Sequence, residues 1–331
     1  MKKHVMGYSI SIALLFVVTW FAVSIGSVKI PFSILWHPST ADEASLNILW
    51  KIRMPRVILA GLVGAALAMA GAAFQGLLKN PLADPYTLGI SSGASVGAVI
   101  TLFFGISTSA FGLLTLPVFS MLGALMAMVI VLSFAKLVDR SMKMETLILT
   151  GIIMSSFLSA VISLMIALTG EELRQILNWL MGSVSMRGWV YVRMIWPFLF
   201  IGALLLWLNR KELNALLFGE ERAHYLGVNV KRSKWMILIG GSILTGSAVA
   251  VSGTIGFVGL VVPHMTRLLF GSDHRHVLPL SFINGATLLI FCDLIARTII
   301  APTELPIGVI TSFIGAPVFA FIFFKQRRKV R

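Results

Sequence analysis

Ser91 is the residue whose sequence context most resembles that of a catalytic nucleophile. It lies in the segment GISSG, residues 89–93, which fits the G-x-S-x-G pattern of serine hydrolases, and His264 is the candidate general base. That pattern works only where a strand turns sharply into a helix and exposes the serine. Here the segment opens a long apolar stretch whose glycines have a simpler use in helix packing. We therefore expect no catalytic residue, and keep a serine hydrolase inside the membrane as a minor alternative.

The segment PHMTRLLFGSDHRH groups four residues of types that bind metals: His264, Asp273, His274 and His276. No two of these histidines are four residues apart, the spacing that places two ligands on one helix face. The single cysteine, Cys292, excludes a thiolate cluster and lies in an apolar run typical of a buried side chain. We expect a solvated or partner-facing loop here, and neither a metal nor a cofactor bound by this chain.

The composition predicts that these residues are positioned by helices in a lipid bilayer. Hydrophobic residues make up 57% and charged residues 12% of the 331 residues, and the mean hydropathy is +0.93. One soluble core cannot hide that much apolar surface. About 20 apolar residues span a bilayer as a helix, and the sequence predicts about ten such spans: 7–28, 57–77, 86–106, 112–135, 146–168, 190–208, 235–252, 255–270, 277–300 and 306–324. A shorter helix at 173–181 is expected at the membrane interface.

The segment from Gly253 to Leu269 is apolar enough for a bilayer, yet glycines and Pro263 interrupt it. A span facing lipid cannot leave backbone groups unpaired at such breaks, so the segment must lie inside a helix bundle or beside a water-filled path. Small residues at every fourth position, as in Gly64-Ala68-Ala72-Gly76, predict close helix packing. A loose match between residues 68–81 and 248–263 also suggests inverted repeats. These features favour a transport protein.

The distribution of Lys and Arg predicts the orientation. Positively charged short loops stay in the cytoplasm, and most of the 27 Lys and Arg residues fall on one side if both termini are cytoplasmic. The net charge of +14 therefore reflects membrane topology and requires no nucleic-acid partner, and the basic C-terminal tail suits contact with anionic lipid. The stretches that carry this charge are 2–3, 79, 136–143, 210–234, 267–275 and 325–331.

Three arginines break the charge rule: Arg53, Arg56 and Arg297 fall at the outer ends of expected spans. Each alone could be an interfacial anchor, but three on one face would suit docking of an acidic partner. Asp293 is the sole carboxylate inside an expected span, and we expect it to pair locally with Arg297. Because intramembrane charge is scarce and no G-x-x-x-x-G-K-[ST] motif is present, a transporter powered by a partner is favoured over an ion-coupled one.

Ordered blocks along nearly the whole chain resemble the FecCD, or vitamin-B12-permease, family of ABC importers. The blocks are RMPRVILAGLVGAALAMAGAAFQGLLKNPLADPYTLGISSGAS, NWLMGSVS, GFVGLVVPHMTRLLFGSDHR and ELPIGVITSFIGAPVF. The resemblance implies a type II importer fold, all-α and polytopic, in one permease domain over residues 1–331. It also implies two ATPase subunits that hold ATP and Mg, a second permease that is either a copy or a paralogue, and an extracytoplasmic binding protein.

The resemblance also implies roles for particular residues. Residues 210–234 are similar to the family's cytoplasmic coupling loop, in which Glu221, Ala223, Leu226 and Gly227 would contact the ATPase. Asn80, Leu82 and Thr146 resemble positions that narrow the inner exit. Arg53, Arg56 and Arg297 match positions that receive acidic residues of the binding protein. The expected location is the plasma membrane of a prokaryote. The expected substrate is a metal chelate, most of all a ferric siderophore, with haem or cobalamin as the alternative substrates. The alternative mechanism is ion-coupled secondary transport.

Overall fold

The computed structural model describes residues 2–26, 42–107, 111–139 and 143–330, and this part of the chain contains helices and no strand. The helices are α1 (Lys2–Ser24), α2 (Glu43–Asn47), η3 (Ile48–Arg53), α3 (Met54–Leu77), η4 (Pro85–Leu88), α4 (Ile90–Phe103), η5 (Gly112–Leu114), α5 (Thr115–Val138), α6 (Met144–Leu168), α7 (Leu173–Leu180), α8 (Gly188–Leu208), α9 (Arg210–Leu217), α10 (Glu220–Tyr225), α11 (Val230–Ser252), α12 (Val258–Phe270), α13 (His274–Thr298) and α14 (Ile307–Val330).

Every expected span coincides with an apolar helix, which confirms the all-α polytopic prediction. Among the described residues, seven helices are long and apolar enough to cross a membrane, and α4, α12 and the apolar part of α14 are shorter apolar helices. The expected interfacial helix is α7. Residues 140–142 and 331, which belong to the basic stretches, and residues 27–28 of the first expected span lie outside the described residues.

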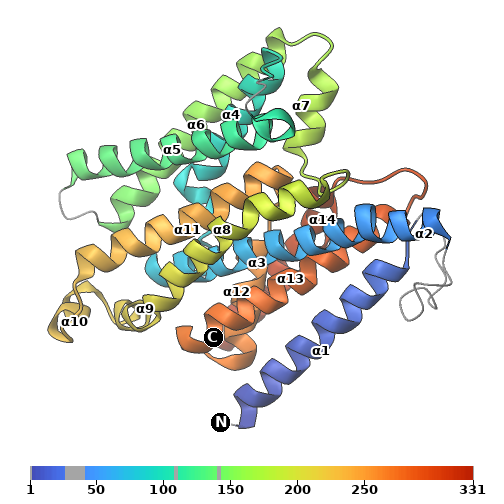
Figure 1. The fold of residues 1–331 in the computed structure, drawn as a ribbon. Helices are drawn as coiled ribbons and strands as arrows, with labels where there is room; N and C mark the ends of the chain where they lie inside the picture. The colour runs from blue at the N-terminus through green and yellow to red at the C-terminus, as the bar shows by residue number, and fades with distance from the viewer. Residues whose placement is uncertain (1, 27–41, 108–110, 140–142, 331) are drawn as a thin grey trace.

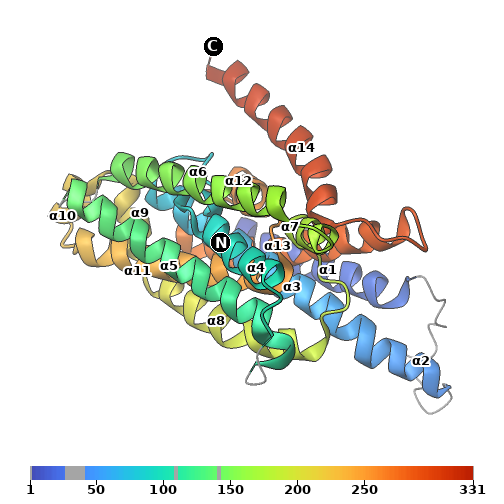
Figure 2. The same ribbon diagram turned by 90° about the horizontal axis from the view of Figure 1, so that it is seen from above.

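Helices α3 and α6 differ most in burial: α3 is at the centre of the bundle and α6 is at its surface. Helix α3 is central, with 83% of its most apolar stretch buried, because α8, α11, α12 and α13 all pack against it. Only 6% of the corresponding stretch of α6 is buried. Figures 1 and 2 place α2 and α10 at opposite ends of the bundle, and Figure 2 shows α14 projecting away from it. We call these ends the α2 end and the α10 end.

Small residues let the central helices approach closely, as their spacing predicts. A Cβ atom at Gly64 would overlap the carbonyl oxygen of Gly285, which brings α3 against α13. The same relation joins α4 to α5, since a Cβ atom at Gly93 would overlap the carbonyl of Gly123. Such contacts between backbones gain dispersion energy that larger side chains would prevent. The glycine stripes are therefore packing surfaces.

The predicted break between the seventh and eighth spans is a non-helical loop, residues 253–257, inside the bundle. Gly253 has a φ of 72°, a conformation that glycine adopts without steric cost. The loop's free backbone groups find partners in the protein, because the Tyr86 hydroxyl donates to the Ile255 carbonyl and accepts from its N–H. The two segments suspected of being repeats also touch: the Gln75 amide donates to the Gly259 and Leu260 carbonyls. The repeat itself remains a prediction.

Candidate functional site

The three unexpected arginines meet at the α2 end, but they are buried. Arg53, Arg56 and Arg297 are 4%, 8% and 5% exposed. They come from η3, α3 and α13, and α3 and α13 are packed side by side. Together with Asp293 and Glu304 they form a group that we call the arginine cluster. Buried charges persist only when they are paired or hydrogen-bonded, and Asp293 and Glu304 pair with Arg56 and Arg297.

Arg56 is the centre of the arginine cluster. Its Nη2 atom lies 2.9 Å from Asp293 Oδ1, its Nε atom donates to the same carboxylate, and its Nη1 atom donates to Glu304 Oε1 at 2.7 Å. The same Nη1 atom also reaches the Ser185 hydroxyl at 3.4 Å. This guanidinium therefore joins α3, α13, the loop before α8 and the loop before α14.

The expected local pair of Asp293 with Arg297 is the weaker of two pairings. Arg297 Nε lies 3.7 Å from Asp293 Oδ2, whereas Arg56 makes bidentate hydrogen bonds to the same carboxylate. Sequence spacing favours a partner on the same helix, but here the facing helix offers a better-placed donor. Arg297 also donates to the Ala22 carbonyl at the end of α1, and Arg53 donates to the carbonyls of Val23 and Ser24.

Glu304 is the exposed acid of the arginine cluster. Its side chain is 38% exposed, against 1% for Asp293. Burial alone would raise the pKa of the Glu304 carboxyl, but the hydrogen bond and positive charge of Arg56 lower that pKa below its ordinary value. Sequence analysis missed Glu304 because it lies in a loop between spans. Glu304, a carboxylate of the same chain, therefore lies between the buried Arg56 guanidinium and the solvent.

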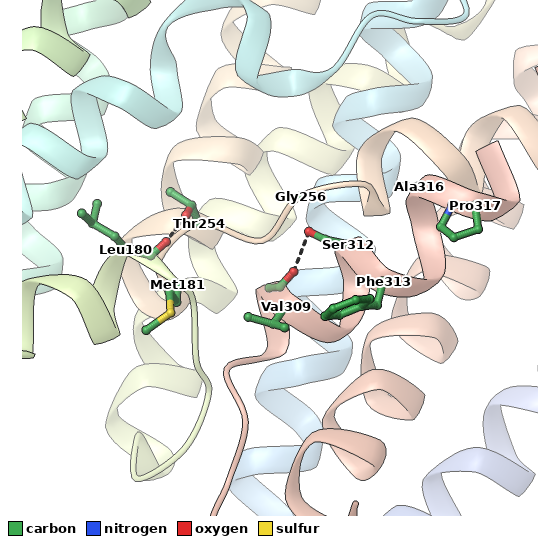
Figure 3. Close-up of a pocket in the computed structure, with 10 residues that line it drawn as sticks. Leu180, Met181, Thr254, Gly256, Val309, Ser312, Phe313, Ala316 and Pro317 are labelled. Atoms are coloured by element: carbon green, nitrogen blue, oxygen red, sulfur yellow. Dashed lines mark hydrogen bonds between the residues drawn. The ribbon is translucent and has the colours of Figure 1, made fainter. Parts of the chain in front are cut away.

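An apolar pocket of about 610 Å³ lies where the helix break, α7 and α14 meet (Figure 3). Thr254 of the break donates a hydrogen bond to the Leu180 carbonyl at the end of α7, and Ser312 donates to the Gly308 carbonyl within α14. None of the described residues that line it carries a charge: Leu180, Met181, Thr254, Gly256, Gly308, Val309, Ser312, Phe313, Ala316 and Pro317. The pocket can hold a bulky molecule with a largely apolar surface.

At the α10 end, the loop 210–234 forms two short helices, α9 and α10, before α11 begins. Glu221 and Gly227 are exposed, and Leu226 is 68% exposed, so these three can contact a partner. Ala223 is fully buried and anchors α10 instead of contributing to its outer surface. Tyr225, 87% exposed, extends this surface, and sequence analysis missed it.

A buried lysine fixes α10 to the bundle. Lys234 of α11, only 2% exposed in its side chain, lies 2.6 Å from Glu220 at the start of α10. A buried amine needs a counter-charge, so this pair holds the short helix at a defined place on α11. Movement of α10 by a partner would therefore be transmitted directly to α11, which ends at the helix break.

Two of the three expected gate residues, Asn80 and Thr146, directly follow residues that line another pocket, of about 340 Å³. These lining residues are Lys79 and Glu145. Asn80 Oδ1 accepts a hydrogen bond from the Leu82 N–H, which holds the turn after α3, and Leu82 is 44% exposed. Thr146 is in the first turn of α6 and is partly exposed.

The serine and histidine candidates from the sequence lie in helices: Ser91 in α4, His264 in α12, and His274 and His276 in α13. Ser91 is buried in the first turn of α4, and the strand that a nucleophile elbow requires is absent from the part of the chain that the structure describes. Within the same described residues, no three His, Cys, Asp or Glu side chains are grouped so that they could hold a metal ion. The His274 backbone N–H donates to the Asn214 amide oxygen, and the same oxygen lies 2.9 Å from His274 Nδ1.

The fold and these surfaces define a multi-pass transport subunit, and comparison with known proteins assigns it to a family. Residues 14–325 match the FecCD transport family. The chain is 58% identical to the uncharacterized ABC transporter permease protein YvrB of Bacillus subtilis, over 97% of this chain and 94% of that protein. It is 40% identical to the hemin transport system permease protein HmuU of Yersinia pestis, over 93% and 92% of the two chains.

A solved structure described as an inward-facing conformation of a metal-chelate type ABC transporter has the same fold. It superposes with a TM-score of 0.85 at 31% identity and covers 97% of this chain and 99% of its own. The chain therefore belongs to the FecCD transport family and is a permease subunit of an ABC importer rather than an enzyme.

Proposed function

We propose that this permease carries a metal chelate across the cytoplasmic membrane of a prokaryote, from an extracytoplasmic binding protein at the α2 end to the cytoplasm at the α10 end. The observation that carries the proposal is the uncharged pocket at the helix break, between a cationic end and an end with an exposed short helix. A broken helix beside a cavity is the usual setting of a membrane transport path.

The substrate that we propose first is a ferric siderophore, with haem and cobalamin as the other candidates. A pocket without charged lining residues suits a bulky chelate that already encloses its metal, because the ligand's own groups satisfy the ion. A bare metal ion would require oxygen, nitrogen or sulfur ligands. Two relatives are named for the other candidate substrates: the hemin permease above and a cobalamin import system permease of Halobacterium salinarum.

Orientation follows from charge. With α10 in the cytoplasm, the basic loop 210–234 obeys the positive-inside rule, and both termini are cytoplasmic. The arginine cluster then faces outward, where Arg53, Arg56 and Arg297 would receive acidic residues of the binding protein. The cluster holds three cations and two carboxylates, so it keeps a positive charge toward such a partner.

The surface of α10, at the other end of the molecule, would bind the ATPase subunits. We propose that Glu221, Leu226 and Gly227 on α10 contact one of two ATPase subunits, with Ala223 holding the helix from beneath. ATP and Mg would be bound there, and this chain would bind no cofactor. The exposed apolar faces of α6 and α14, which include Phe157 (64% exposed) and Phe321 (68% exposed), leave room for a second permease, either a copy or a paralogue, and for lipid.

The cycle that these parts support is alternating access. Loaded binding protein docks at the α2 end, and ATP binding and hydrolysis move α10 and, through Lys234, the helix α11 that ends at the break. The chelate then passes the pocket toward the cytoplasm, where Asn80, Leu82 and Thr146 would narrow the exit. Each state is favoured by the ligand that binds it better.

The deciding experiment reconstitutes the permease in liposomes with its ATPase and binding protein and measures accumulation of iron-55 siderophores, haem and cobalt-57 cobalamin. We expect one chelate to accumulate against its gradient, and only with ATP and the ATPase present. Accumulation by the permease alone, driven by an imposed proton gradient, would instead establish an ion-coupled transporter. Accumulation of haem or cobalamin but of no siderophore would replace the first-choice substrate.

A further inference from the structure

Glu304 lies in the position that a docking partner's carboxylate would need. Its Oε1 atom is 2.7 Å from Arg56 Nη1, the one guanidinium nitrogen of Arg56 that is not bonded to Asp293. Glu304 is also the exposed member of the pair, at 38% against 10% for the side chain of Arg56. Any acidic side chain arriving from outside therefore has to compete with Glu304 before it can reach Arg56.

The loop that carries Glu304 leads directly into the pocket. Leu305 donates its N–H to the Ala296 carbonyl, and Ile307, the first residue of α14, donates its N–H to the Gly182 carbonyl. The next residue, Gly308, lines the pocket and approaches the carbonyl of Met181 so closely that a Cβ atom there would overlap it. Only three residues of chain separate the ion pair from the pocket wall.

The other side of the pocket is joined to the same guanidinium. Arg56 Nη1 also reaches Ser185, whose N–H donates to the Ser183 hydroxyl, and the Ser183 N–H donates to the Ser252 carbonyl at the end of α11. This loop begins with Met181, a pocket residue. One nitrogen of Arg56 thus contacts both the loop that follows Met181 and the loop that precedes Gly308, two residues of the pocket lining.

We propose that Glu304 is an internal substitute for the acidic residue of the docking protein, and that exchange of one carboxylate for the other at Arg56 releases the start of α14 from the pocket wall. The proposal rests on the docking role of the arginine cluster proposed above. The exchange costs little, because the arriving carboxylate takes the place of Glu304 at Arg56 Nη1, and Arg56 remains paired with Asp293 throughout.

The arrangement links docking to opening. While the binding protein is absent, Glu304 keeps the loop 301–306 and the first turn of α14 in place. Arrival of a partner carboxylate removes that restraint at the moment when a loaded binding protein is in position. The pocket is then exposed to the outside only when substrate is at hand.

The test uses the full-length chain in nanodiscs and a fluorescent hexaglutamate peptide as the acidic probe. Glu304→Gln removes the competing charge and keeps the side chain's shape. The control Glu43→Gln removes the same charge from the exposed first residue of α2, at the same end of the molecule. Hydrogen exchange of the segment containing the Leu305 and Ile307 amides reports release of the loop, and Thr303→Val, which alters only a hydrogen bond to Ile300, controls for local disturbance.

We expect Glu304→Gln to bind hexaglutamate about threefold more tightly than the natural chain, with Glu43→Gln unchanged. Hydrogen exchange at Leu305 and Ile307 should rise on adding hexaglutamate to the natural chain, and should already be raised in Glu304→Gln without peptide but not in Thr303→Val. Two results would contradict the replacement of Glu304 by a partner carboxylate while leaving the docking role in place. One is an equal gain in hexaglutamate affinity in Glu304→Gln and Glu43→Gln; the other is a hydrogen-exchange rate that the peptide does not change. Absence of binding to every form would contradict the docking role itself.

Discussion

Arg56 and Asp293 are 237 residues apart in sequence and form a buried bidentate ion pair, with Arg56 Nη2 2.9 Å from Asp293 Oδ1. The pair joins α3 to α13. The same two helices also touch at Gly64 and Gly285, farther along their interface. Charge at one end and small residues along the contact thus fix the same two helices. The end of that interface that holds the ion pair is also the proposed docking end.

Removing the carboxylate should destabilise the bundle strongly. Asp293→Ala leaves Arg56 and Arg297 buried without their shared counter-charge, and breaking a buried pair from one side typically costs about 3–5 kcal/mol. We expect a large fall in the thermal unfolding temperature of the detergent-purified protein. The double variant Arg56→Met with Asp293→Leu, which removes both charges, should be the more stable of the two, and a result in the reverse order would contradict this view of the pair.

Charge reversal at Arg53 and Arg56 should unfold the protein before it can test docking. Arg56→Glu places a carboxylate beside Asp293 in a buried site, so the combined Arg53→Glu and Arg56→Glu variant is expected to lose folded protein before docking can be measured. Expression level and unfolding temperature of that variant check this directly. If it folds like the natural protein, the buried pair is dispensable and its uptake becomes a clean measure of docking.

Close contact between α3 and α13 should tolerate no side chain at Gly64. Gly64→Val sets methyl groups against the carbonyl oxygen of Gly285, and overpacking of this kind costs about 1–3 kcal/mol or more. We expect lower yield and a lower unfolding temperature. Gly170→Ala is the matched control, because a Cβ atom there has no neighbour within 4 Å, and it should leave both measurements unchanged.

Helix positions could be predicted from sequence because bilayer thickness fixes the length of an apolar span. The glycine stripes and the break at Gly253 could be predicted because each follows a local rule. Small residues allow helix backbones to pack closely, and backbone polar groups inside a membrane need hydrogen-bond partners. The convergence of Arg53, Arg56 and Arg297 was also expected from the charge anomaly. The predicted pair of Asp293 with Arg297 is present, but sequence spacing did not predict the closer pair that Asp293 forms with Arg56 on a facing helix, far away in sequence.

Exposure within short segments also escaped prediction. The structure buries Ala223 and exposes Tyr225 within the same short helix, and the pair of Glu220 with Lys234 fixes the start of that helix on α11. The helix before the second span was missed for another reason. Charged residues at Lys51 and Arg53 end the apolar run, yet the backbone stays helical from Glu43 to Leu77, since a helix needs no apolar side chains beyond the hydrocarbon.

Loosening α10 should separate ATP hydrolysis from transport. Lys234→Met replaces a buried amine by an apolar side chain of similar length, a change that is often near neutral for stability. It frees Glu220 and with it α10, so we expect a loss of uptake with little change in unfolding temperature. Lys231→Met, on the exposed first turn of α11, is the control. Uptake that falls equally in both variants would show that surface charge, not the buried pair, is responsible.

Acidic pH should weaken the start of α13 through Asp273. Burial alone would raise the pKa of this carboxyl, but hydrogen bonds from the Arg275 N–H and the Asn214 amide lower it below its ordinary value. Because the folded-state pKa lies below the unfolded one, the carboxylate stabilises the fold above the unfolded-state pKa, and this contribution is lost as pH falls through the folded value. Unfolding temperature should drop below about pH 4.

Asp273→Asn separates this titration from the others. Asparagine keeps the capping geometry at the helix start but carries no ionisable group, so the variant should show a smaller loss of unfolding temperature between about pH 5 and pH 3. The natural chain and the variant are compared in the same detergent at each pH. Identical pH profiles for the two would assign the acid sensitivity to other carboxylates.

Filling the apolar pocket should block passage without unfolding the protein. Ala316 lines the pocket on α14, and Ala316→Trp would occupy part of its roughly 610 Å³ with a rigid ring. Since the pocket is open to one side, the ring can enter it without displacing the core, so we expect uptake to fall while the unfolding temperature stays near that of the natural chain. Ile201→Trp, on an exposed position of α8 outside the pocket lining, should transport normally. Unimpaired uptake by Ala316→Trp would place the substrate path elsewhere in the molecule.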